Sequence, residues 1–389
     1  MKCALRPLAL LSLVALVALA PLPLAPGAPT VKAARPGEDL SKELESLRDR
    51  AGAPGVVALA LVEGQVAAWG AAGVRAYGSD ARLAIDDPIH LGSCAKAITA
   101  TLVATLVEDE LLTWDTTVAE ALPAFSKRID PGYHSVTVEQ LLRHRGGIAE
   151  RRRPELGAAF DFLLSAEGPA PEVRLDTLAR VLELPPVAPP EDGFDYSNYG
   201  YMAVGAMVQA RAGKPWSELI VERVFRPLEL KSAGAWSPSG ADVPVGHTQD
   251  GDGWTPLAPG PKGALPDALG PAGLVHSNLA DWARFVADHL AGFRGEDGLV
   301  TAESYRRLHA DPLASGYACG WGVDAYEWDG RDRTLLTHAG SDNTWYATVF
   351  ALPEADVVVV TAANCGGTPG AEAAEGAKER LLEALRSSD

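Results

Sequence analysis

The sequence predicts an α/β protein of the α+β kind, in which the two ends of the chain build one antiparallel sheet. Residues 55–74 read GVVALALVEGQVAAWGAAGV, two apolar runs around a polar turn, which is typical of a β-hairpin. Residues 344–364, TWYATVFALPEADVVVVTAAN, contain two more such runs. Helical patterns at residues 39–48 and 371–388 lie outside these strands, so we expect N- and C-terminal helices to flank the sheet.

The middle of the chain has a different character. From residue 97 to residue 269, helical patterns alternate with loops rich in proline and glycine, such as ELPPVAPPEDG. We therefore expect a mainly helical domain, residues 97–269, inserted into a sheet domain made of residues 38–96 and 270–389.

The first residues, 1–34, resemble a secretory leader. Lys2 and Arg6 precede an apolar run from Leu8 to Ala20, and proline- and alanine-rich sequence follows. The run is shorter than the roughly 20 residues that span a bilayer. We expect export to the periplasm or the extracellular space, with no stable membrane span after the leader is cleaved.

The charge balance argues against a nucleic-acid partner. The 389 residues include 34 basic and 51 acidic side chains, for a net charge of -17. Nucleic-acid binding depends on clustered lysine and arginine, and this composition opposes it. We therefore expect no nucleic-acid partner, and the sequence leaves the oligomeric state open.

Metal and disulfide chemistry have little support in the sequence. Three cysteines follow the leader, Cys94, Cys319 and Cys365, without a CxxC pair. A bridge between Cys319 and Cys365 stays open, and Cys94 is expected to be buried and inert. We expect no cofactor and no metal. Seven histidines lack metal-ligand spacing and are assigned structural roles: His90, His134, His144, His247, His276, His289 and His309.

One candidate for catalysis lies in HLGSCAKAITATLV, where Ser93 and Lys96 precede a long apolar helical pattern. Residues three apart share a helix face, so the two side chains would be neighbours. A lysine whose pKa is lowered by burial can take the proton of a serine nucleophile. The alternative is that Ser93 caps the helix and Lys96 extends into solvent.

Two further candidates occur later in the chain. In FDYSNYGYMAV, Tyr196 and Asn198 come just before another apolar helix, where a phenol can move protons and an amide can hold a carbonyl. In LLTHAGSDN, His338 and Gly340 fall on a predicted strand, whose exposed amides can stabilise an oxyanion. Taken singly, each has a structural alternative. The first could be an aromatic packing cluster with a helix cap, and the second a structural histidine whose hydrogen bonds are satisfied beside the strand.

Together and in this order, the three motifs SxxK, Tyr-x-Asn and His-x-Gly resemble those of the serine β-lactamase and penicillin-binding-protein superfamily. The segments VTVEQLLRHRGGI, YSNYGYMAVGAMV and PAGLVHSNLADWARFV are similar to the branch that contains class C β-lactamases, DD-carboxypeptidases, D-aminopeptidases and esterases. The resemblance covers roughly residues 40–385. It implies the serine β-lactamase/DD-peptidase-like fold.

The resemblance also implies a role for each motif residue. Ser93 matches the acylated nucleophile, Lys96 its base or proton relay, and Tyr196 the second proton shuttle, and the choice of base between the last two stays open. The remaining matches are binding groups: Asn198 for the substrate amide, His338 and Gly340 of the third motif, and the backbone amides of Ser93 and Ser341 as the oxyanion hole.

The implied function is an exported serine hydrolase that acts on D-amino-acid peptides or small esters through a covalent acyl-enzyme. A true β-lactamase is one alternative, although His338 replaces the lysine of most β-lactamases and a neutral histidine holds a carboxylate less well. A catalytically weak penicillin-binding or sensing protein is another. It is suggested by Arg145-Gly146, and by Thr344, which stands where many relatives have glycine and is expected to narrow the substrate channel.

Overall fold

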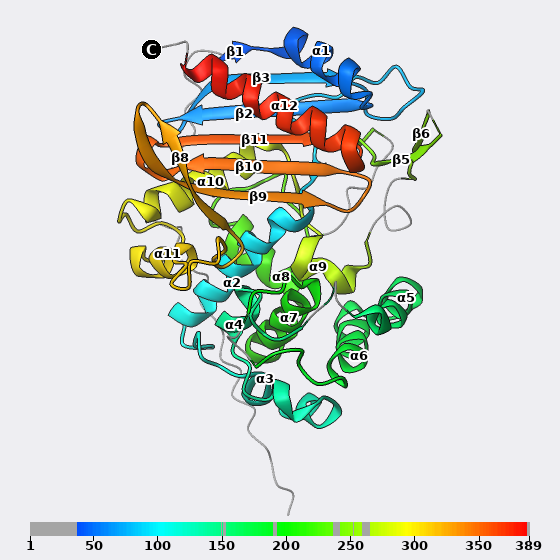
Figure 1. Cartoon of the computed structure of the whole chain (residues 1–389), viewed down its shortest axis with the longest axis vertical. Coiled ribbons are helices and arrows are strands. Elements are labelled where there is room, and N and C mark those ends of the chain that lie inside the picture. The colour runs from blue at the N-terminus through cyan, green and yellow to red at the C-terminus, as the bar shows by residue number, and fades with distance from the viewer. Residues whose placement is uncertain are drawn as a thin grey trace, which may run out of the picture.

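The computed structural model describes residues 37–148, 150, 153–189, 193–235, 242–251, 253–258 and 265–386. The predicted leader, residues 1–34, lies outside this part of the chain. A seven-stranded sheet forms one layer, and most of the helices gather below it in the view of Figure 1.

The sheet joins the two ends of the chain in the order β1-β3-β2-β11-β10-β9-β8. Its strands are β1 (Glu38–Asp39), β2 (Gly55–Val62), β3 (Gln65–Gly73), β8 (Gly322–Trp328), β9 (Arg331–Ser341), β10 (Tyr346–Leu352) and β11 (Val357–Ala363). The predicted hairpins are β2-β3 and β10-β11, and β2 pairs with β11 across the chain. All pairs are antiparallel except that of the short β1 with β3, which the sequence did not predict.

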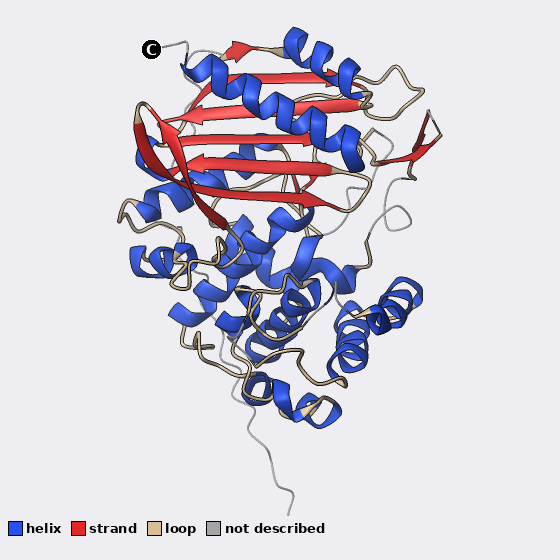
Figure 2. Ribbon diagram, in the orientation of Figure 1, coloured by secondary structure: helices blue, strands red, loops and turns tan. Residues whose placement is uncertain are grey.

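The central strands are buried on both faces, with alternate residues in two separate cores. On β2, Val57 and Leu59 face one core, whereas Val56 and Ala58 face the other. This alternation follows from the two-residue period of a strand. Helices α1 (Ser41–Ala51) and α12 (Gly367–Arg386) cover one face, and α10 (Leu279–Phe293) packs on the other (Figure 2). The predicted terminal helices are thus confirmed.

The rest of the described chain is mainly helical. Its helices are α2 (Ala95–Glu108), α3 (Val118–Ala121), α4 (Val138–Leu142), α5 (Gly157–Ser165), α6 (Ala170–Leu182), α7 (Asn198–Ala212), α8 (Trp216–Ile220), α9 (Gly270–Gly273) and α11 (Ala302–His309). Two small ribbons join them: β4 (Ile89–His90) with β7 (His276–Ser277), and β5 (His247–Asp250) with β6 (Gly253–Pro256).

Helix α2 links the two parts of the molecule. It begins beside β9 and runs away from the sheet into the helical part (Figure 1). Nearly all its residues are buried, as expected for a helix that is apolar on every side. Its first turn therefore places the Ser93 segment beside β9.

Candidate active site

The nucleophile candidate lies on a tight turn pressed against β9. Ser93 is in the short 3-10 turn η1 (Gly92–Cys94), immediately before α2. Gly92 has φ +52°, and a Cβ there would lie 2.6 Å from the Ser341 nitrogen. A Cβ on Gly340 would lie 2.1 Å from the Leu91 carbonyl oxygen and 2.7 Å from the Ser93 nitrogen. Glycine at both positions lets the turn approach the strand, so the main chains at residues 93 and 341 lie close together.

Lys96 lies under this turn instead of reaching into solvent. Its side chain is fully buried, and its Nζ is 3.0 Å from the Ser93 Oγ. The same Nζ donates to the Asn198 Oδ1 at 2.8 Å and to the Ala272 carbonyl oxygen at 2.6 Å. Burial lowers the pKa of Lys96 from 10.5 to about 7, and the negative charge of Glu150 opposes that shift. Near neutral pH the amine is therefore protonated in only part of the molecules.

The Tyr-x-Asn motif enters the site at the start of α7. Asn198 is the first residue of this helix, and Ser197 is its N-cap, with its Oγ accepting the Gly200 N–H. The ring of Tyr196 is half-buried, with its centroid 4.8 Å from the Lys96 Nζ. The start of α7 thus places the Asn198 amide and the Tyr196 ring beside the same lysine.

The third motif contributes a buried, neutral histidine. His338 lies on β9, as predicted, and burial lowers its pKa to about 4. Its Nδ1 donates to the Ala339 carbonyl oxygen at 2.7 Å, so its Nε2 is the acceptor for the Tyr317 hydroxyl at 3.0 Å. At neutral pH this side chain supplies no positive charge.

Three residues at the site were not singled out as site residues from the sequence. Glu150 accepts a hydrogen bond from the Asn198 Nδ2 at 2.9 Å. The Tyr317 hydroxyl donates a hydrogen bond to the His338 Nε2. His144, which was expected to have a structural role, packs on Tyr196 with ring centroids 4.2 Å apart. All three come from irregular segments, where neither hydrophobic periodicity nor a short motif marks a residue.

Thr344, which was expected to narrow the substrate channel, bonds to a residue of its own turn and packs beside Gly246. The Thr344 Oγ1 donates to the Asp342 Oδ1 at 2.9 Å, and a Cβ on Gly246 would lie 2.5 Å from that same hydroxyl. The Thr344 side chain therefore lies between the turn after β9 and the segment that contains Gly246. The glycines of the altered HRGG segment also pack closely: a Cβ on Gly146 would lie 2.7 Å from a methyl of Leu141.

The three cysteines of the described chain are free and buried, so the bridge left open between Cys319 and Cys365 is not formed. Burial raises the pKa of all three thiols above the ordinary value, to about 12 for Cys319 and Cys365. Cys94, beside the nucleophile, is buried as predicted, and its raised pKa keeps it a thiol.

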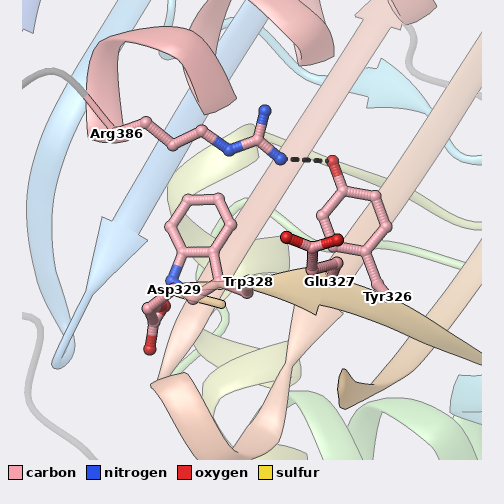
Figure 3. A pocket seen from close by; sticks show the side chains of 5 residues that line it. All are labelled: Tyr326, Glu327, Trp328, Asp329 and Arg386. Carbon is pink, nitrogen blue, oxygen red and sulfur yellow. Dashed lines mark hydrogen bonds between the residues drawn. The ribbon is translucent and has the colours of Figure 1, made fainter. Parts of the chain in front are cut away.

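A surface pocket lies elsewhere, at the edge strand of the sheet. It is lined by Tyr326, Glu327, Trp328 and Asp329 of β8 and the turn after it, together with Arg386 at the end of α12 (Figure 3). Tyr326 pairs with Arg333, five residues before His338 on β9. At about 3.3 Å per residue, the pocket is on the order of 15 Å from the third motif. It is thus separate from the Ser93 site.

Comparison with known families identifies the class of protein. The family model described as Beta-lactamase matches residues 40–384, so the chain belongs to the Beta-lactamase family. The resemblance seen in the sequence is thereby confirmed, and so is the α/β fold that it implied.

Individual relatives agree with this assignment. The chain is 28% identical over 337 residues to penicillin-binding protein 4 of Amycolatopsis lactamdurans, covering 84% of each chain. It superposes on the octameric penicillin-binding protein homologue from Pyrococcus abyssi with a TM-score of 0.71 at 24% identity, covering 88% of this chain and 77% of that one. For D-amino acid amidase from Ochrobactrum anthropi SV3 the TM-score is 0.66 at 20% identity, with 89% and 98% covered. The two solved structures share the fold with this chain.

Proposed function

We propose that this protein is an exported serine hydrolase that forms a covalent acyl-enzyme at Ser93 and acts on D-amino-acid peptides or small esters. The family assignment supports hydrolase chemistry, and a D-amino acid amidase of similar fold supports the substrate class. The export part of the proposal rests on the leader at residues 1–34. Among the described residues, no helix is long and apolar enough to cross a membrane.

The observation that carries the proposal is the set of partners around the Lys96 nitrogen. Two of them, the Asn198 Oδ1 and the Ala272 carbonyl oxygen, can only accept hydrogen bonds, whereas the Ser93 hydroxyl can donate. A neutral amine would give its two N–H groups to the two carbonyl oxygens. Its lone pair would then face Ser93, which is the arrangement of a general base with its nucleophile.

The remaining steps follow from this arrangement. As Ser93 Oγ attacks the substrate carbonyl carbon, its proton passes to Lys96, and the carbonyl oxygen becomes an oxyanion. The main-chain amides of Ser93 and Ser341 are the proposed donors to that oxyanion. Tyr196, beside Lys96, delivers a proton to the leaving group as the carbon–heteroatom bond breaks. The Lys96 ammonium then passes its proton to the Tyr196 phenolate, which restores both groups. Water attacks the acyl-enzyme ester, one of its protons passes through Lys96 to the departing Ser93 Oγ, and the acid and free Ser93 are released.

The neutral state of His338 argues against β-lactams as the main substrate. A β-lactam carries a carboxylate that a cation at this position would hold. With a pKa of about 4 and its Nε2 already bonded to Tyr317, His338 offers no such charge at neutral pH. This supports peptides and esters that react without a charge at the third motif.

The test is covalent labelling followed by intact mass. The purified protein and a Ser93→Ala variant are treated separately with a penicillin and with a serine-reactive phosphonate, and turnover of a D-amino-acid peptide and of a small ester is measured. We expect the phosphonate, and not the penicillin, to label Ser93. Turnover should fall by several orders of magnitude in the Ser93→Ala variant.

Each other outcome selects a different function. A stable penicillin adduct indicates a penicillin-binding protein, and transient acylation with product release indicates a β-lactamase. Equal turnover by the native protein and Ser93→Ala would show that Ser93 is not the nucleophile. If neither reagent forms an adduct and neither substrate turns over, the catalytically weak binding or sensing alternative replaces the proposal.

A further inference from the structure

His144 accepts hydrogen bonds from the residues on both sides of Tyr196. The carbonyl oxygen of His144 accepts the N–H of Asp195 at 2.8 Å, and its ring Nδ1 accepts the N–H of Ser197 at 3.1 Å. The residue before Tyr196 and the residue after it are therefore both tied to one buried side chain and its own main chain.

The hydrogen bond to Ser197 defines the form of the His144 ring. A backbone N–H can only donate, so Nδ1 must be unprotonated, and the neutral ring carries its hydrogen on Nε2. That Nε2 is buried without a hydrogen-bond partner in the described part of the chain. Burial and the charge of Lys96 lower the pKa of His144 well below its ordinary value, which keeps the ring in this neutral form.

The ring of His144 also packs on the aromatic side chains of the site. Its centroid is 4.2 Å from that of Tyr196 and 4.8 Å from that of Tyr317. The backbone of His144 adopts φ +57°, in the left-handed region that residues other than glycine seldom occupy. Such a conformation is kept where surrounding contacts hold it, here the two bonds beside Tyr196.

We propose that His144 is a positioning residue that holds Tyr196 in place to protonate the leaving group, through the bond from the Ser197 N–H to its ring nitrogen. The proposal rests on the function proposed above, because it needs Tyr196 as the proton donor. His144 acts on the reaction through Tyr196 and does not itself touch the reacting atoms.

Two complementary substitutions separate the acceptor of His144 from its ring. His144→Asn keeps an acceptor, because the Asn Oδ1 is bonded to Cγ just as Nδ1 is, and asparagine tolerates φ above zero. His144→Phe keeps a ring and loses the acceptor. A third variant, His134→Phe, removes the hydrogen bond that another histidine ring donates to the Ser126 carbonyl oxygen, and is the control for the loss of a histidine ring.

The assay compares the phenyl ester and the p-nitrophenyl ester of one acid. Both produce the same acyl-enzyme, but phenolate is a poorer leaving group than p-nitrophenolate and depends more on a proton donor. We expect His144→Phe to lower kcat/KM for the phenyl ester by roughly 10- to 100-fold, at or below the lower end of what proton transfer contributes, because Tyr196 is displaced and not removed. The p-nitrophenyl ester should lose much less, and His144→Asn should keep most of the native ratio between the two esters.

The outcomes distinguish this inference from the proposed function. Thermal unfolding of each variant is measured alongside, so that a folding defect is recognised by a lowered melting temperature. If turnover depends on Ser93 but His144→Phe keeps the native ratio of the two esters, or if Asn and Phe lower both esters equally, the positioning role is wrong. If the native protein and Ser93→Ala behave alike, the proposed function fails and the role of His144 fails with it.

Discussion

Replacing Lys96 with methionine should change how the stability of the protein depends on pH. The pKa of Lys96 is about 7 in the folded protein, lowered by burial from the 10.5 of an ordinary lysine. Between these two values the unfolded chain holds one proton more than the folded protein at this residue. Unfolding free energy must therefore rise with pH through this window, by about 1.4 kcal/mol for each pH unit.

The size of the effect can be set against a variant that lacks the amine. Lys96→Met has a side chain of similar length and no titrating group, so its unfolding free energy lacks the rise with pH that Lys96 causes. From pH 7, where the amine is already half titrated, to pH 9 the native protein should gain about 2.3 kcal/mol over the variant. The hydrogen bonds lost on substitution change the difference in unfolding free energy between the two proteins by nearly the same amount at every pH. They therefore add little to the slope of that difference with pH.

The measurement is urea unfolding of both proteins at pH 6, 7, 8 and 9. Lys378→Met is the matched control, because the pKa of Lys378 is raised by its neighbouring glutamates and the residue stays charged throughout this range. Its difference from the native protein should be nearly constant. A constant difference for Lys96→Met as well, within about 0.5 kcal/mol, would refute the lowered pKa of Lys96 and with it the reasoning for Lys96 as the base.

Two other predictions concern the same site. The rate of hydrolysis should rise with pH through about 7 as Lys96 loses its proton. Glu150→Gln removes the charge that raises the pKa of Lys96, so it should move this rise to lower pH in a profile of kcat/KM against pH. A profile that is unchanged or moved to higher pH would contradict the role given to Glu150. Gly340→Ala should destabilise the protein by roughly 1–3 kcal/mol and abolish Ser93 labelling, because its Cβ would lie 2.1 Å from the Leu91 carbonyl oxygen. Gly157→Ala on α5 is the control, because the added Cβ has open space around it. Similar melting temperatures for the two variants would show that the turn can move.

The sequence by itself determined the strands β2, β3, β10 and β11, the strand that carries His338, the terminal helices and the order of the three motifs. Two-residue alternation and apolar runs are local properties, so β2-β3 and β10-β11 could be recognised before any contact was known. The short β1 was missed because two residues carry no periodicity. The motif residues were recognisable because their chemistry and their order along the chain are together rare, although each motif alone also fitted a structural role.

The tertiary structure decided the state of each group in the site. Whether Lys96 faces solvent or is buried under Ser93 depends on α9 and α7, which supply the Ala272 and Asn198 oxygens from distant parts of the chain. The neutrality of His338 depends on burial, and its tautomer follows from the Ala339 carbonyl, with Tyr317 as the donor to its other nitrogen. Proton affinity is set by desolvation and neighbouring charge, which belong to the folded surroundings and not to the residue type.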